Sequence, residues 1–341
     1  MSKSAVTINY EIRPCKFVER RMLLASLSRI LGAIRKGKDY QYIGFGGCSF
    51  TDFKLFHREL QIDQMISIEN GNYSKHKLEL NKPFQCIKIL RGDSNTVLPT
   101  IDLSIPSLIW LDYDGVLQKY MFEDLETIFH TVPAGSIFIF SCNRELKKVN
   151  YVELEGHITN KADGQSPMSP EEIKEVFGDL VPFDIEPDAC TPEKSFYTIK
   201  RMLDKKIRGT ISDRNLSKDE NNKFHLLYNI IYQEKRGAKM FTYGGIVCNE
   251  SVNIDSVCLD NFDFITKEEN DAVYRIDVPI LTHRETLALN QILFDKDKEK
   301  EFIEDKIITE NELMEYKKIY KYCPSTYSGA YPFTFRQLIR V

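Results

Sequence analysis

Short apolar runs alternate with helix-like stretches through the first part of the chain. Apolar runs lie within residues 41–47, 64–70, 84–94, 107–115 and 135–143, and each is followed by Gly, Asp, Glu or Asn. Their apolar positions are continuous, which is typical of strands buried on both faces. Residues 51–60 and 123–130, which lie between runs, have a helical pattern. Strands interleaved with helices predict a mostly parallel sheet that helices cover on both faces.

The chain before and after this region is less regular. Residues 16–36 have an apolar face opposite several arginines, which predicts an amphipathic helix that ends at Gly37. The stretch 160–170 is rich in Gly, Pro and Ser and is expected to be a loop. A capping signal at 169–172 then predicts a helix start.

The second half is predicted to complete the sheet and cover it. In chain order, we expect an exposed connection at 203–222, a helix at 224–232, a strand at 239–249, antiparallel strands at 262–265 and 273–279, a helix from 282 to 293, and a charged helical tail at 295–322. The expected organisation is a helical segment at 1–37, an α/β sheet domain at 38–280 with an inserted loop and helical region around 160–235, and a helical region at 281–341.

Composition narrows the class of protein. The 46 Lys+Arg and 50 Asp+Glu give a net charge of −4, with 42% hydrophobic and 28% charged residues, which is ordinary globular usage. This near-neutral balance argues against general electrostatic binding to nucleic acid or a membrane. No run of about 18 uncharged apolar residues is present. The 8 cysteines are scattered without a C-x-x-C pair, which predicts reduced thiols, no metal site and a cytoplasmic protein.

The residues that follow the strands are the informative ones, because open α/β sheets bind ligands at the carboxyl ends of their strands. Gly44, Gly46 and Gly47 follow the first run, where glycines allow a ligand to approach the backbone. A plain turn would also use them. Glu69 follows the second run, at the distance where dinucleotide-binding folds hold ribose hydroxyls.

The third and fourth runs end in further acidic residues. Asp93 precedes Ser94 and is placed either to accept a hydrogen bond from an exocyclic amine or to cap a helix. Asp112, Tyr113 and Asp114 follow the fourth run. Two carboxylates beside an aromatic ring indicate function, since an unpaired buried charge costs free energy.

This order of a glycine-rich turn, Glu, Asp and Asp resembles class I S-adenosylmethionine-dependent methyltransferases. The chain is also similar to a bacterial group described as putative O-methyltransferases, through the segments RPCKFVERRML (13–23), YIGFGGCSFTDF (42–53), MISIEN (65–70), WLDYDG (110–115) and VPILTHRE (278–285). The resemblance implies a Rossmann-like sheet, S-adenosylmethionine as cofactor, and methyl transfer to an O- or N-nucleophile that the sequence does not identify.

The resemblance also implies a role for each candidate residue. The cofactor is expected to lie over the glycine turn, with its ribose on the acid after the second strand, its adenine at the end of the third, and its methyl group at the end of the fourth. The implied cofactor-binding residues are Gly44, Gly46, Gly47, Glu69, Asp93, Ser94, Asp112 and Tyr113, and the catalytic candidates are Asp112 and Asp114.

One position departs from the family pattern. Methyltransferases commonly carry an acid two residues before the first glycine, whereas this chain has Tyr42 and a Gly-Phe-Gly-Gly turn. Either another group such as Asp52 substitutes for that acid, or the fold is kept in a catalytically inactive binding protein.

Two further functions are left open by the sequence. LIWLDYDGVL (108–117) matches the opening motif of haloacid-dehalogenase-type phosphatases, with Asp112 as nucleophile, Asp114 as acid/base, Ser141 as hydroxyl, and Asp179 and Asp184 as Mg²⁺ ligands. That motif normally opens its domain, which it does not here.

The C-terminal tyrosines among lysines at 316–331 would suit nucleic-acid stacking, but packing onto the core is favoured.

Overall fold

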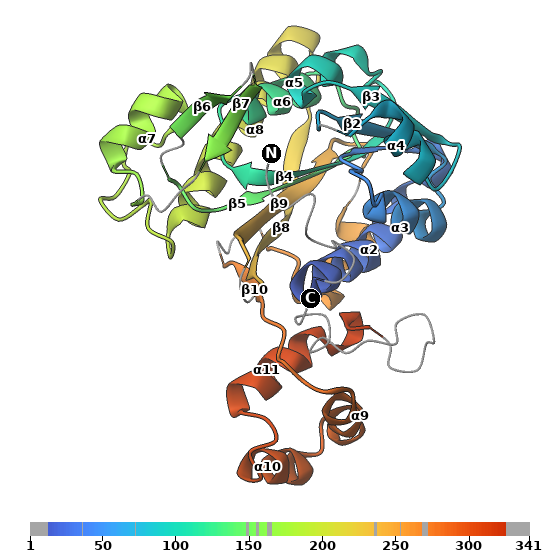
Figure 1. Ribbon diagram of the computed structural model, residues 1–341. Coiled ribbons are helices and arrows are strands. Elements are labelled where there is room, and N and C mark those ends of the chain that lie inside the picture. Colours follow the sequence, from blue (N-terminus) through green and yellow to red (C-terminus); the bar gives the residue numbers. More distant parts are fainter. Residues whose placement is uncertain are drawn as a thin grey trace.

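One sheet of eight strands carries the fold (Figure 1). The computed structural model describes residues 13–35, 37–71, 73–147, 150–154, 157–161, 166–234, 237–252, 254–267 and 272–324. The sheet order is β10-β8-β9-β5-β4-β1-β2-β3. Its strands are β1 (Gln41–Gly44), β2 (Gln64–Glu69), β3 (Ile87–Arg91), β4 (Ser107–Val116), β5 (Ile137–Asn143), β8 (Lys223–Gln233), β9 (Lys239–Cys248) and β10 (Tyr274–Ile276).

The sheet is mostly parallel, as predicted. Only β9 pairs antiparallel within this described sheet, with β5 on one side and β8 on the other. The chain runs outward from β1 through β2 to β3, and then returns to add β4 and β5 on the opposite side of β1. This reversal between β1 and β4 is a topological switch point, where the carboxyl ends of open α/β sheets form a crevice.

Helices cover both faces because side chains alternate along each strand. Tyr42 and Trp110 face a core shared with α2 (Pro14–Ile34) and α3 (Thr51–Leu60). The residues next to them on β1 and β4 face the opposite core. That core contains α6 (Tyr120–Phe129), α7 (Pro170–Phe177) and α8 (Ser195–Lys218). Short helices α4 (Lys75–Asn81) and α5 (Ser94–Val97) follow β2 and β3.

The C-terminal helices form a small core of their own below the sheet (Figure 1). They are α9 (His283–Ile292), α10 (Lys296–Glu304) and α11 (Glu310–Ile319). Tyr316 is buried there and donates to Asn290 Oδ1 at 2.7 Å, so it packs in the core rather than offering a stacking surface. Tyr327 and Tyr331 lie outside the described residues. The division of the chain at residues 37 and 280 stays a prediction.

Several predicted elements of the second half are wrong. Residues 203–222 lie mostly in α8 rather than in an exposed connection, because Ile199, Leu203 and Ile207 repeat every fourth residue and bury one face. Residues 224–232 form β8 rather than a helix: both of its faces are buried, so its apolar run shows no strand alternation. Residues 262–265 form a turn with one bridge at Ile265, and β10 pairs parallel with β8.

Other boundaries follow the sequence closely. Ser169 and Thr282 both form capping boxes, as their signals predict. The hairpin of β6 (Asn150–Leu154) and β7 (His157–Lys161) was not predicted. All eight cysteines are free thiols. Among the helices that the structure describes, none combines the length and the apolar character needed to cross a bilayer.

Gly37 follows α2 and packs closely against the last residue of α3. A Cβ atom at Gly37 would lie 1.7 Å from the carbonyl oxygen of Leu60, whereas one at Gly32, inside α2, meets no atom within 4 Å. We expect Gly37→Ala to lower the free energy of unfolding by about 1–3 kcal/mol, the usual cost of overpacking. Gly32→Ala should raise it by roughly 0.5–1 kcal/mol through helix propensity.

Urea unfolding followed by circular dichroism measures both variants under the same conditions. The two substitutions add the same methyl group, so opposite signs isolate the steric contact at Leu60. Equal changes in the two variants would contradict it.

Candidate active site

The glycine turn after β1 is shaped largely by the protein itself. A Cβ at Gly44 would lie 2.5 Å from Tyr42 Oη, and one at Gly46 would lie 2.6 Å from Ser67 Oγ. Gly47 differs, because its φ of 55° favours glycine and the space beside it is open. Of the three predicted glycines, Gly47 therefore has the open surface that a ligand needs.

Glu69 holds this turn from the end of β2. Its Oε1 atom accepts hydrogen bonds from the backbone N–H groups of Gly46 and Gly47, both at 2.9 Å, and from Ser67 Oγ at 2.5 Å. Its Oε2 atom makes no hydrogen bond to the residues that the structure describes. Burial raises the pKa of Glu69, and these donors oppose that rise. One oxygen thus fixes the turn, and the other has no partner among the described residues.

Asp93 lies beside Glu69 at the end of the neighbouring strand. It occupies the N-cap position of α5, but its side chain makes no capping hydrogen bond. Instead, its Oδ1 atom accepts from Asn70 Nδ2 at 2.9 Å, and the side chain is exposed. The helix-cap alternative is therefore not realised, and the carboxylate faces the carboxyl edge of the sheet.

Ser94 and Tyr113 are joined through a residue that sequence reasoning missed. Both hydroxyls donate to Asp124 Oδ2 at 2.5 Å, and all three side chains are buried between α5, β4 and α6. Burial raises the pKa of Asp124 to about 6, against the effect of the two hydroxyl donors. The ring of Tyr113 packs edge-to-face against the ring of Phe45 in the glycine turn, with 5.2 Å between the ring centres. The predicted contacts of Ser94 and Tyr113 with a cofactor stay predictions.

Asp112 is paired with the first turn of α2. Lys16 Nζ lies 2.9 Å from Asp112 Oδ1 and 2.8 Å from Glu19 Oε2, and it is 4.4 Å from the centre of the Trp110 ring. Lys16 and Glu19 are sealed from solvent, while the Asp112 side chain is 19% exposed. Asp112 is therefore the solvent-facing end of a buried chain of charges.

The same chain continues through hydroxyl groups into β5 and β9. Glu19 Oε1 accepts a short hydrogen bond from Thr242 Oγ1, which lies 2.9 Å from Ser141 Oγ. Ser141 in turn accepts from Trp110 Nε1 at 3.0 Å. Burial raises the pKa of Glu19, and the ammonium of Lys16 opposes that rise. Asp112 of β4 and Thr242 of β9 thus contact α2 directly, and Ser141 of β5 links these two strands.

The acid expected before the glycine turn has no direct substitute. Asp52 lies in α3, but Arg20 Nε binds its Oδ1 atom at 2.5 Å and shields it from solvent. Tyr42 is buried between the rings of Phe53 and Phe56, and burial raises its pKa. The position of the usual acid is therefore occupied by an aromatic residue, Tyr42, and Asp52 is used in an ion pair with Arg20.

Asp114 lies two residues beyond Asp112, in the irregular stretch where the pairing of β4 with β5 shifts before Val116. Its side chain is exposed at the same edge of the sheet. The structure therefore brings Gly47, Glu69, Asp112 and Asp114 to the switch point between β1 and β4. Their catalytic or binding roles stay predictions.

The phosphatase constellation is not assembled. Asp184 binds Arg201, and Asp179 lies in the 3-10 helix after α7 rather than at a strand end. Ser141 is fully buried and bonded to Trp110 and Thr242. Within the described ranges, no group of three or more His, Cys, Asp or Glu side chains is placed to hold a metal ion.

Comparisons with solved structures give distant likenesses. Trm1 from Pyrococcus horikoshii, solved with S-adenosyl-L-methionine, is 11% identical over 75% of this chain and 60% of that one, with a TM-score of 0.43. The O-methyltransferase TomG from Streptomyces achromogenes, in complex with SAM, is 13% identical over 67% and 79%, with a TM-score of 0.35. At these values the likenesses do not bear on what this chain binds.

A probable spermidine synthase from Corynebacterium glutamicum is 15% identical, with a TM-score of 0.32. The match covers 37% of this chain and 47% of that one, so the chain spans about half the length of that protein. A comparison with curated proteins gave no match.

A family model is far more informative, because it matches nearly the whole chain. The model described as "Putative O-methyltransferase" matches residues 8–329, which include the glycine turn, all eight strands of the sheet and the C-terminal helices. This match confirms the predicted resemblance and supports S-adenosylmethionine as the predicted cofactor. The chain belongs to this putative O-methyltransferase family.

Proposed function

We propose that this protein binds S-adenosylmethionine at the switch point between β1 and β4 and transfers its methyl group to an oxygen or nitrogen nucleophile. The observation that carries the proposal is the geometry of Glu69. Its Oε1 atom accepts from the Gly46 and Gly47 amides, its Oε2 atom makes no hydrogen bond to the described residues, and the space beside Gly47 is open. A carboxylate at this place in a doubly wound sheet suits a pair of ribose hydroxyls.

The rest of the cofactor is assigned along the same edge. The exposed Asp93, held by Asn70, lies where the adenine amino group would donate. Asp112 would face the sulfonium, and the Phe45 and Tyr113 rings border the turn. An edge lined with carboxylates suits a cationic cofactor better than a phosphate-rich one.

Asp112 is suited to face a positive charge because its surroundings are anionic overall. Three carboxylates, those of Glu19, Asp52 and Asp112, share the two cations Lys16 and Arg20. A sulfonium would add the missing positive charge at the exposed end of this cluster. Because Lys16 fixes Asp112 Oδ1, the carboxylate is held in place before the cofactor arrives.

The bound cofactor supplies an electrophilic methyl group on a positively charged sulfur. In the transfer, the acceptor lone pair forms the new bond to carbon, and the sulfur keeps the electron pair of the bond that breaks. The acceptor also loses a proton. Asp114, exposed at the same edge, and Asp112 are the groups placed to receive it. Alignment of the two reactants in a shaped site supplies much of the rate enhancement.

Glu69→Gln tests the cofactor site. The glutamine carbonyl can still accept from Gly46 and Gly47, but its amide group cannot accept from a ribose hydroxyl. We expect S-adenosylmethionine to bind the variant about tenfold to a hundredfold more weakly, as measured by isothermal titration calorimetry.

Glu59→Gln is the matched control, because Glu59 is exposed on α3 and makes no hydrogen bond within the part of the chain that the structure describes. Its affinity should equal that of the wild type. No binding by the wild type at millimolar cofactor would remove the cofactor assignment. Unchanged binding by Glu69→Gln would remove the role of Glu69 alone.

Asp112→Asn tests whether this carboxylate faces the sulfonium. S-adenosylhomocysteine lacks the methyl group and the positive charge but shares the rest of the cofactor. We expect the variant to bind S-adenosylmethionine about tenfold more weakly and S-adenosylhomocysteine unchanged, because only the first gains from the negative charge.

Asp93→Asn is the comparison, since Asp93 is assigned to the adenine end. That variant should weaken both ligands by the same factor. Equal weakening of both ligands by Asp112→Asn would place Asp112 away from the sulfonium, and circular dichroism checks that each variant is folded.

A further inference from the structure

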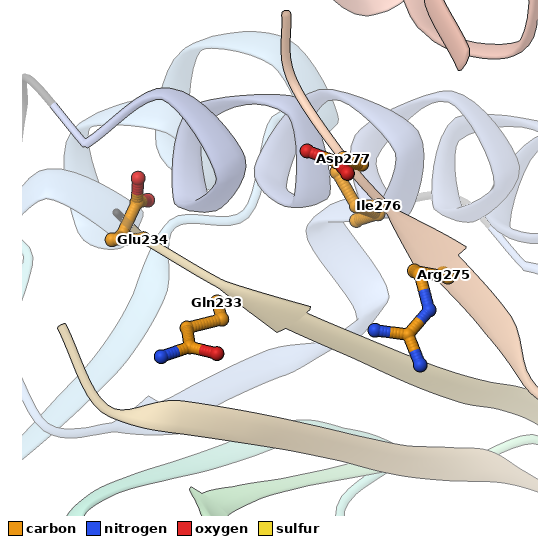
Figure 2. A pocket seen from close by; sticks show the side chains of 5 residues that line it. All are labelled: Gln233, Glu234, Arg275, Ile276 and Asp277. Carbon is orange, nitrogen blue, oxygen red and sulfur yellow. The ribbon is translucent and has the colours of Figure 1, made fainter. Parts of the chain in front are cut away.

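A polar cavity lies at the same carboxyl edge of the sheet, beyond the ends of β8 and β10. Its volume is about 250 Å³, and Gln233, Glu234, Arg275, Ile276 and Asp277 line it. Figure 2 shows Gln233 and Arg275 apart on either side of the β8 ribbon, with Glu234 and Asp277 above them in the view. The volume is just below the roughly 300–1,000 Å³ of sites for drug-sized ligands, so it suits a small metabolite.

Two of these residues carry opposite charges that are not paired with each other. Neither Arg275 nor Asp277 forms an ion pair or a side-chain hydrogen bond with any residue in the described ranges. Both side chains are exposed. A guanidinium binds carboxylates through two parallel hydrogen bonds, and a carboxylate accepts from an ammonium. Each residue is therefore available to a ligand group of the opposite sign.

The remaining polar residues have different tasks. Glu234 accepts a hydrogen bond from the backbone N–H of Lys16 at 3.1 Å, so it is already used to cap α2. Gln233 offers an amide to either end of a ligand. Arg144 lies near Arg275, and desolvation together with the charge of Arg275 lowers its pKa. Its buried Nε atom has no hydrogen-bond partner among the described residues. A second guanidinium near Arg275 strengthens the attraction of this side for an anion.

One residue separates this cavity from the proposed methyl-transfer site. Lys16 binds Glu234 through its backbone N–H and Asp112 through its Nζ atom, at 3.1 Å and 2.9 Å. The two sites are therefore about one lysine side chain apart along the same edge. A small molecule held in the cavity would be close enough to extend a side chain toward Asp112.

We propose that this cavity is the acceptor subsite and that it binds a small metabolite with both an amine and an acid group, as in a free amino acid. Arg275 binds the acid group, Asp277 binds the ammonium group, and Gln233 bonds to either. The ligand's own oxygen or nitrogen nucleophile extends toward Asp112, takes the methyl group from the sulfonium and releases its proton to a carboxylate at the edge. This acceptor role rests on the proposed function, whereas binding in the cavity does not.

The test uses the full chain and the twenty free L-amino acids as probes. Ligand-observed NMR identifies those that bind, and calorimetry gives the affinity of the tightest one for each variant. We expect at least one to bind, and Arg275→Gln and Asp277→Asn each to weaken it about tenfold or more. Arg284→Gln and Asp260→Asn alter exposed residues elsewhere and should have no effect.

Derivatives of the tightest amino acid separate its two charged groups. Its N-acetyl form lacks the ammonium and its amide lacks the carboxylate, so wild type should bind each about tenfold more weakly. Asp277→Asn should bind the N-acetyl form and the parent amino acid with equal affinity. Arg275→Gln should bind the amide and the parent amino acid with equal affinity.

Three results would overturn the proposal. They are no amino acid binding at 10 mM, unchanged affinity in both cavity variants, and equal binding of acetate or phosphate alone, which would indicate a simple anion site. S-adenosylmethionine is titrated against the same variants and should bind each like the wild type. Failure of S-adenosylmethionine to bind the wild type would remove the proposed function. The amino-acid site would still be tested separately by the amino-acid titrations.

Discussion

The ion pair between Lys16 and Asp112 is the contact on which the geometry of the carboxyl edge depends. A lysine that is 2% exposed has lost nearly all of its hydration, and Asp112, Glu19 and the rings of Trp110 and Tyr232 compensate for it. Removing one partner of such a pair typically costs about 3–5 kcal/mol. Helix α2 therefore cannot leave the sheet without leaving charges unpaired. The same contact holds the Asp112 carboxylate in place at the end of β4. One ion pair thus both stabilises the packing of α2 and fixes the orientation of this carboxylate.

A second constraint acts on the other side of the switch point. Glu69 and Ser67 bond to the amides of the glycine turn, so β2 fixes the conformation of the segment that leaves β1. In this turn, Gly44 and Gly46 are required by contacts within the protein, and only Gly47 combines a positive φ with open space. A glycine-rich turn is therefore weak evidence of a ligand by itself. The carboxylate that organises it is the stronger sign.

The sequence was sufficient for the first half of the fold and insufficient for much of the second. Five apolar runs predicted five strands because each is short, continuous and bounded by turn residues. The same continuity made β8 look like a helix, since a strand buried on both faces has no alternating pattern. In α8, the abundance of charge obscured an apolar repeat of four residues. Strand ends, which topology brings together, were the most predictable part of the candidate site.

The partners of the candidate residues were not predictable, because they come from distant segments. Lys16 reaches Asp112 over 96 residues, and Glu19 reaches Thr242 over 223. In the sequence, α2 is only an amphipathic helix, and its charged residues look like a solvated face. The structure shows the opposite: Lys16, Glu19 and Arg20 are buried, the first two against the sheet and Arg20 against Asp52 of α3. The surroundings of Tyr42 were not predictable either. At the position where the family has an acid, Tyr42 packs against Phe53 and Phe56 rather than beside a carboxylate.

These contacts also connect two polar regions at the edge of the sheet. The first turn of α2 lies across the carboxyl ends of the strands, where Lys16 binds Glu234 after β8 and Asp112 in β4. The helix thereby separates an anionic region around Glu69, Asp112 and Asp114 from a cavity with charges of both signs. Two adjoining regions of different electrostatic character are thus held at a fixed separation by one buried lysine.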